Sequence, residues 1–113
     1  MYNQREIVLV PFPYSDLSFS KRRPVLVISN NYYNKNFPDI FCVITSNLFK
    51  DAYSVDLNDE HLESGVLPEK SIIKRHKLFT VEQTKIIRRF SVISEQKFDE
   101  IINMLQKLIN KSN

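Results

Sequence analysis

The apolar residues of this chain change their spacing near residue 91, and this change constrains the fold more than any other feature. Before it, they come in short uninterrupted or alternating runs, which is typical of strands. After it, they recur at spacings of three or four residues, and one face of a helix then carries Phe98, Ile101, Ile102, Leu105, Leu108 and Ile109. Ser94 is the expected N-cap of this helix.

Short strands fill the part of the chain before the helix. The expected strands are 6–11, 23–29, 40–45, 53–57, 71–77 and 86–91. We expect loops at 12–22 and 58–65, a short helical turn within 30–39 and a turn at 81–84. Since a set of about six strands loses its exposed edges by closing, the fold class predicted for residues 1–113 is one mainly β domain, a small barrel with a C-terminal helix.

The charges are unevenly distributed along the sequence. The net charge is +3, and ten of the 16 Lys and Arg residues lie in three clusters, at 21–23, 70–77 and 85–89. Five acids lie in one stretch between the first two clusters, from Asp51 to Glu63. Separated signs favour one positive face that attracts polyanions, and the alternative is a solvated surface with scattered ion pairs.

Cysteine usage and hydropathy indicate a cytoplasmic protein. Cys42 is the only cysteine, so no intrachain disulfide can form, and its apolar neighbours predict a buried, inert thiol. We expect no signal peptide and no membrane span, because no apolar run approaches about 20 residues. The spacing of Cys and His residues predicts no metal site, and we expect no cofactor.

The segment 21–29 carries the strongest functional signal. Lys21, Arg22 and Arg23 end a polar loop, and an apolar strand begins at once with Pro24. The planar fork of an Arg side chain donates two parallel hydrogen bonds to a phosphate. A loop beside a strand end is a place where a rigid scaffold can aim such groups at a ligand.

With these residues in place, the chain resembles the MazF/PemK family of type II toxins along nearly its whole length. The similar segments are 6–13, 21–29, 43–46, 65–74 and 77–80. The resemblance implies an SH3-like barrel with a C-terminal helix and a homodimer. It also implies a metal-independent endoribonuclease that cuts single-stranded RNA at short sequences. An antitoxin with an acidic flexible segment would block the enzyme, and DNA would be contacted only through the antitoxin complex.

Two residues match the catalytic positions of that family. Cleavage without a metal uses the 2′-hydroxyl of the RNA as nucleophile and needs a group that stabilises phosphoryl charge. Arg23 suits the charge, since a group protonated up to about pH 12 is a poor base. Thr45 would donate to a phosphoryl oxygen or position the 2′-hydroxyl. The alternatives are a loop-solvating Arg and an ordinary strand Thr.

At two positions the sequence departs from the family pattern. Arg5 and Glu6 stand where relatives usually have Gly and Asp, and we expect that Arg5 cannot take the unusual backbone angle a Gly allows. His76 stands where relatives often have an acid. It is the candidate general base, with Lys74 on the same side of the strand as a phosphate contact; a surface His without a role is the alternative.

Further RNA contacts are predicted around the first loop and the third strand. Lys21 and Arg22 would support the phosphate, Tyr14 and Phe19 would stack on bases, and Ser46 would assist Thr45. Two non-enzymatic functions compete with the nuclease. One is a topoisomerase poison like the CcdB toxins, which resemble this fold. The other is a nucleic-acid-binding regulator with a degenerate site.

Overall fold

The computed structural model describes residues 1–11, 22–46, 52–67 and 71–112, without the side chains at 44, 46, 71 and 74–77. The strands are β1 (Glu6–Pro11), β2 (Arg22–Val27), β3 (Asp39–Ser46), β4 (Val55–Leu57), β5 (Leu62–Gly65), β6 (Ser71–Glu82) and β7 (Arg88–Ile93). The helices are α1 (Asn31–Asn36) and α2 (Glu95–Ile109), and two 3-10 turns are η1 (Asp59–His61) and η2 (Gln83–Lys85).

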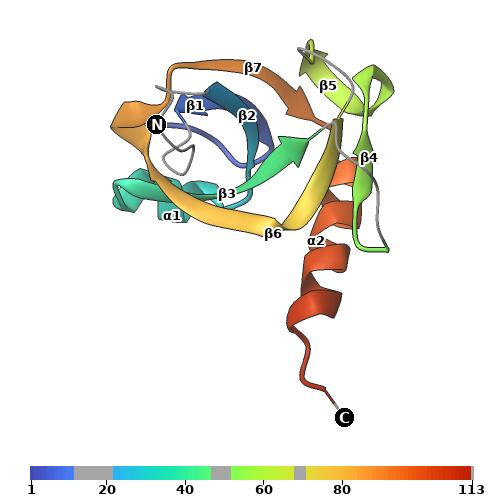
Figure 1. Cartoon of the computed structure of the whole chain (residues 1–113). Coiled ribbons are helices and arrows are strands. Elements are labelled where there is room, and N and C mark those ends of the chain that lie inside the picture. Colours follow the sequence, from blue (N-terminus) through green and yellow to red (C-terminus); the bar gives the residue numbers. More distant parts are fainter. Residues whose placement is uncertain (12–21, 47–51, 68–70, 113) are drawn as a thin grey trace, which may run out of the picture.

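The seven described strands form one antiparallel sheet in the order β4-β6-β3-β2-β1-β7-β5. The two outermost strands, β4 and β5, follow each other in the chain and are joined only by Asn58 and η1. A connection this short brings the two ends of the sheet together, so the sheet curls into a barrel-like roll (Figure 1). The predicted mainly β fold with one C-terminal helix is thereby confirmed.

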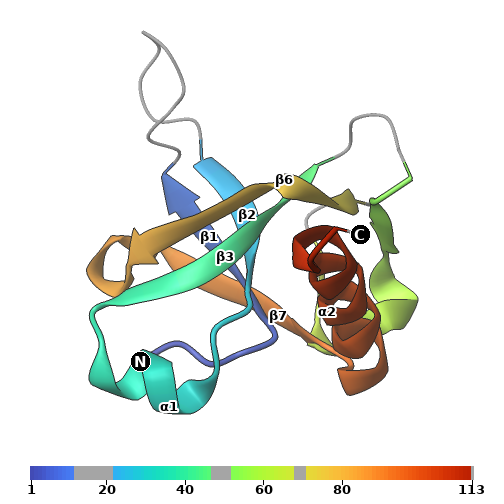
Figure 2. The same cartoon turned by 90° about the horizontal axis from the view of Figure 1, so that it is seen from below.

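Both faces of the central strands are buried. Ile7, Leu26 and Val43 point toward α2, and we call this the helix face. Neighbouring residues such as Val8 and Val25 point the other way and form a second apolar cluster, on the opposite face. Burial on both sides explains why these segments read as continuous apolar runs rather than as alternating ones. Figure 2 shows α2 against one side of the curled sheet and α1 away from it.

The C-terminal helix begins as its sequence predicts. The Ser94 hydroxyl accepts a hydrogen bond from the Lys97 N–H at 3.1 Å, and Phe98 and Ile101 are buried in the helix-face core. Ile109, which belongs to the predicted apolar face, is 78% exposed because the last turns of α2 extend past the sheet (Figure 1).

Several strand boundaries differ from the prediction. Strand β7, expected at 86–91, is Arg88–Ile93, and β2, expected at 23–29, is Arg22–Val27. The segment 62–65, expected in a loop, forms β5 by pairing with β7. Strand β6 continues to Glu82 because it pairs with β3 along its length, and the expected turn follows as η2. Strand β4 is shorter than the predicted segment 53–57. The helical turn expected within 30–39 is α1.

The expectation for Arg5 was wrong. Its φ is +78°, which lies in the left-handed region that favours Gly. Three hydrogen bonds hold it there: the Arg5 N–H donates to the Val27 carbonyl at 3.0 Å, and its guanidinium donates to the Ile93 carbonyl at 2.8 Å and to Glu63 at 3.2 Å. The contacts of this Arg therefore offset the strain of its backbone.

The neighbouring acid, Glu6, is 5% exposed and fixes the N-terminal turn. One carboxylate oxygen pairs with the Arg89 guanidinium at 2.6 Å, and the other accepts from the Asn3 N–H. The N-terminal end of β1 is thus held by two ion pairs, Arg5 with Glu63 and Arg89 with Glu6.

The only glycine of the chain gives a test of how β5 packs on β7. Gly65 has φ +81°, and a Cβ there would lie 2.3 Å from the Phe90 carbonyl oxygen and 2.7 Å from Ser91 Cα. Because backbone atoms cannot yield as a flexible side chain does, Gly65→Ala should lower the free energy of unfolding by about 3 kcal/mol. Urea unfolding measures this, with Ser64→Ala as the exposed control in the same strand. Equal midpoints for the two variants would contradict the packing.

Burial makes a second prediction, for the only thiol. Cys42 is fully buried, and desolvation raises its pKa to about 12. A thiol without thiolate character is a poor nucleophile, so a chromogenic disulfide reagent should label none of the native protein at neutral pH and one thiol per chain in denaturant. Rapid labelling of the native protein would contradict the burial of this strand.

Candidate nucleic-acid site

The start of β2 and the end of β3 form the candidate site, because the two strands are antiparallel neighbours. Val25 pairs with Ile44, and one step further the Thr45 hydroxyl donates to the Pro24 carbonyl at 3.0 Å. Thr45 therefore lies across from the residue that follows Arg23. The backbones of the two predicted catalytic residues are adjacent.

The side chains of Arg23 and Thr45 leave the sheet on opposite faces. Side chains alternate along a strand, so Thr45 shares the helix face with Val43, and Arg23 shares the opposite face with Val25. The pairing of Arg23 with Val10, a member of the second cluster, agrees with this assignment. A ligand that contacts both residues must bind at the end of β2, where the long Arg side chain can reach round the strand.

The hydrogen bond of Thr45 restricts what its hydroxyl can do. A hydroxyl has one donor and two acceptor sites. The Thr45 donor is used by Pro24, and the side chain is only 3% exposed. In this arrangement the oxygen can accept a hydrogen bond from a ligand hydroxyl, whereas donation to a phosphoryl oxygen requires rotation away from the carbonyl. The geometry therefore favours acceptance of a hydrogen bond from a ligand hydroxyl over donation to a phosphoryl oxygen.

The cations of β2 differ from those that hold the fold. Arg22 is exposed and Arg23 is half-buried. Among the described residues neither has a carboxylate partner, whereas Arg5 and Arg89 each have one. A guanidinium without a carboxylate keeps its five donors for an anion. Arg22 and Arg23 thus meet the electrostatic requirement of a phosphate site.

Several predicted site residues fall outside what the structure describes. Lys21, Tyr14 and Phe19 lie outside the described residues. Ser46 lies on β3 opposite Ile72, and its side chain is outside the description.

The second basic cluster lies where the sheet is irregular. Lys74 and His76 belong to the segment 74–77 of β6, which faces the single residue Ile44 of β3. Regular alternation therefore does not apply here, and the register gives no support to the expectation that both side chains point the same way. His61, which had no predicted role, has a structural one: its Nδ1 accepts from the Asn58 N–H at 3.1 Å.

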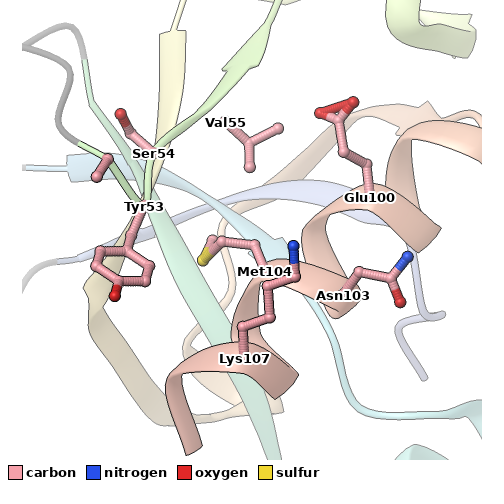
Figure 3. A pocket seen from close by; sticks show the side chains of 8 residues that line it. Tyr53, Ser54, Val55, Glu100, Asn103, Met104 and Lys107 are labelled. Atoms are coloured by element: carbon pink, nitrogen blue, oxygen red, sulfur yellow. The ribbon is translucent and has the colours of Figure 1, made fainter.

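Two pockets in the described part of the chain lie beside α2, and neither is lined by Arg23 or Thr45. The larger, about 460 Å³, lies between α2 and the residues before β4, and Figure 3 shows Tyr53, Met104 and Lys107 on its walls. The smaller, about 190 Å³, lies at the start of α2. Within the described ranges no three His, Cys, Asp or Glu side chains are placed to hold a metal ion, and no helix is long and apolar enough to cross a membrane.

Solved structures of toxins share this fold. An endoribonuclease in complex with its cognate antitoxin from a Mycobacterial species has a TM-score of 0.78 at 12% identity, covering 99% of this chain and 100% of that one. Mycobacterium tuberculosis toxin MazF-mt6 has a TM-score of 0.75 at 14% identity, with 96% and 100% covered. The MazE-MazF (Form-III) structure from Deinococcus radiodurans has a TM-score of 0.75 at 16% identity, with 98% of each chain covered.

Sequence comparison gives the family. No curated protein sequence matches the chain. Residues 3–109 match the family described as PemK-like, MazF-like toxin of type II toxin-antitoxin system. This match spans all the described strands and α2, including the paired strands that carry Arg23 and Thr45. The chain therefore belongs to the PemK/MazF family of type II toxins.

Proposed function

We propose that this toxin is a metal-independent endoribonuclease that cuts single-stranded mRNA at short sequences. The observation that carries the proposal is the Thr45–Pro24 hydrogen bond, which places a hydroxyl oxygen beside the strand start that bears Arg22 and Arg23. RNA carries both a 2′-hydroxyl and a phosphate. In a member of this toxin family, RNA therefore fits a site that combines a hydrogen-bond acceptor with guanidinium groups that have no carboxylate partner in the described part of the chain.

The proposed reaction is an in-line displacement within the RNA. The 2′-oxygen loses its proton and forms a bond to phosphorus, and the bond from phosphorus to the 5′-oxygen breaks. The products are a 2′,3′-cyclic phosphate and, after the leaving oxygen takes up a proton, a 5′-hydroxyl. Thr45 Oγ1 orients the attacking hydroxyl, and the Arg23 guanidinium stabilises the charge on the phosphoryl oxygens, a contribution of about 3–4 kcal/mol.

The remaining site residues are proposed in supporting roles. His76 is the general base that takes the 2′-proton, because imidazole titrates near neutral pH. Lys74, Lys21 and Arg22 contact phosphates, Tyr14 and Phe19 stack on bases, and Ser46 assists Thr45.

The proposed partners are an antitoxin and a second copy of the chain, in the cytoplasm. A flexible acidic antitoxin segment would occupy the cationic site in place of RNA. Exposed apolar side chains favour the dimer: Phe37, just after α1, is 50% exposed, Phe41 on β3 is 39% exposed and Leu78 on β6 is 47% exposed. A small barrel cannot bury these groups, and a second copy can.

Removing either catalytic side chain should abolish most cleavage while the protein stays folded. With a labelled single-stranded RNA and excess EDTA, Arg23→Ala should lower kcat by about 100- to 1,000-fold. Thr45→Val keeps the side-chain shape and should lower kcat by about tenfold or more, because the 2′-hydroxyl loses its acceptor. Lys107→Ala, on α2, is the matched control and should cleave like the wild type. Wild-type rates in both site variants would refute the assigned roles.

The same assay separates the competing functions. Fragments that end in a cyclic phosphate support the nuclease. Intact RNA retained by the protein on a filter would favour the regulator, and intact RNA together with inhibition of a topoisomerase would favour the poison.

The role of His76 predicts a pH effect. A general base must be unprotonated, so kcat/KM of the wild type should fall as the pH drops through the range of about 8 to 5 in which imidazole titrates. His76→Ala should lower the rate by about 100-fold or more and lose this acidic limb. A variant with the wild-type rate and profile would show that another group, or solvent, takes the proton.

A further inference from the structure

A row of four residues crosses the sheet at the candidate site. It ends at Arg88, to which the proposed reaction assigns no role. Leu9 of β1 pairs with Pro24 of β2 on one side and with Arg88 of β7 on the other. The Thr45 hydroxyl joins the row through its hydrogen bond to Pro24. Residues directly opposite each other in antiparallel strands share a face. Arg88 and Thr45 are therefore on the same face of the sheet.

Ring packing places Arg88 on that face independently of the strand register. Its guanidinium carbon lies 4.7 Å from the centre of the Phe90 ring. Phe90 packs against the cluster that contains Ile7, Val43 and Phe98, which is the helix-face core. Because the guanidinium lies over this ring, the Arg88 side chain lies on the same side of β7 as Phe90, which is the helix face.

The next residue along β7 shows the contrast. Arg89 pairs with the buried Glu6 at 2.6 Å, and its guanidinium lies over the Tyr2 ring of the second cluster. Its charge is used to hold the N-terminal turn. Arg88 is exposed and has no carboxylate partner among the described residues. Of the two neighbouring arginines, only Arg88 is available to an outside anion.

A second free cation shares this face. Arg22 pairs with Pro11, two residues along from the pairing of Leu9 with Pro24, so Arg22 has the same orientation as Pro24. It is exposed as well. The helix face therefore carries guanidinium groups at the start of β2 and at the start of β7, with the Thr45 hydroxyl at the third corner.

The distance from Thr45 to Arg88 and the apolar residues between them fit a nucleic-acid strand. Thr45 and Arg88 are three strand spacings apart, on the order of 14 Å. Between them lie Pro24 and Leu9, both half-buried and apolar. In a single-stranded RNA, phosphates alternate with sugars and bases. Guanidinium groups bind the phosphates, and apolar side chains pack against the sugars and bases. An acidic peptide also carries negative charges, but it has no 2′-hydroxyl that could donate a hydrogen bond to Thr45.

We propose that Arg88 is a phosphate-binding residue of the RNA substrate, which crosses β2, β1 and β7 along the row from Thr45 and is also held by Arg22. This inference rests on the proposed ribonuclease function, and it adds a residue and a direction to that function. Arg88 holds a phosphate away from the scissile one, so it contributes to substrate binding rather than to the chemical step.

The test is RNA binding as a function of salt. The probe is a single-stranded RNA with 2′-O-methyl groups, which cannot be cleaved through the 2′-oxygen. Arg88→Ala should weaken binding about fivefold and reduce the slope of log K against log salt by about 0.7 between about 50 and 200 mM salt, as loss of one phosphate contact requires. On cleavable RNA it should raise KM and leave kcat near the wild-type value.

Two further variants separate charge from folding. Arg88→Lys keeps the cation and should restore most of the salt slope. Lys35→Ala removes one positive charge from α1, which precedes β3, whereas Thr45 lies near its far end. This variant should bind RNA like the wild type. If Arg88→Ala and Lys35→Ala lose the same RNA affinity, the loss comes from the lower net charge alone, and the proposal is wrong.

The outcomes distinguish this inference from the function on which it rests. If the wild type cleaves RNA but Arg88→Ala binds with unchanged affinity and slope, the row is not the RNA path and only this inference fails. If the wild type cleaves no RNA but Arg88→Ala loses affinity, the nuclease fails and the binding row stands. If Arg88→Ala loses affinity only for an acidic peptide, the surface belongs to a protein partner and the inference is wrong.

Discussion

The antiparallel pairing of β2 with β3 is the constraint on which the candidate site depends. It brings the start of one strand, where the cations are, beside the end of the other, where Thr45 is, and the hydrogen bond from Thr45 to the Pro24 carbonyl closes the pair at 3.0 Å. Burial on both faces holds these strands in place, since Val25 and Leu26 are completely inaccessible to solvent. Because close-packed cores move little, the backbone of the site is held in position before a ligand binds.

The arginines divide into two groups with different partners. Arg5 pairs with Glu63 and Arg89 pairs with Glu6, and both pairs hold the N-terminal end of β1. Arg22, Arg23 and Arg88 have no carboxylate partner among the described residues, and all three lie at the same end of strands β2 and β7. Three guanidinium groups without a carboxylate partner in the described ranges are thereby gathered at one end of the sheet, although the net charge is only +3. This concentration is what a polyanion meets, and it explains why the average charge understates the basic character of the site.

Periodicity was enough to predict the elements that bury an apolar face. The helix after Ser94 and the strands around Val8, Val25 and Cys42 are where the pattern places them. The apolar pattern did not predict the strands that form by pairing with a neighbouring strand, namely β5 and the second half of β6. The sequence also indicated that Arg23 and Thr45 belong to one region. A sequence does not state which residues pair across neighbouring strands. It could therefore not reveal that the Arg23 and Thr45 side chains leave opposite faces, or that Arg88 shares the face of Thr45.

The claim at the centre of this account is that the nucleophile comes from the RNA itself. The direct measurement is cleavage, in excess EDTA, of two oligonucleotides that contain the same mapped cut site. One is all RNA, and the other has a single 2′-deoxy nucleotide on the 5′ side of the scissile phosphate. The account predicts fragments with cyclic-phosphate ends from the first and no cleavage of the second at that phosphate. Cleavage of both at equal rates would contradict it, because the attacking oxygen would then come from elsewhere.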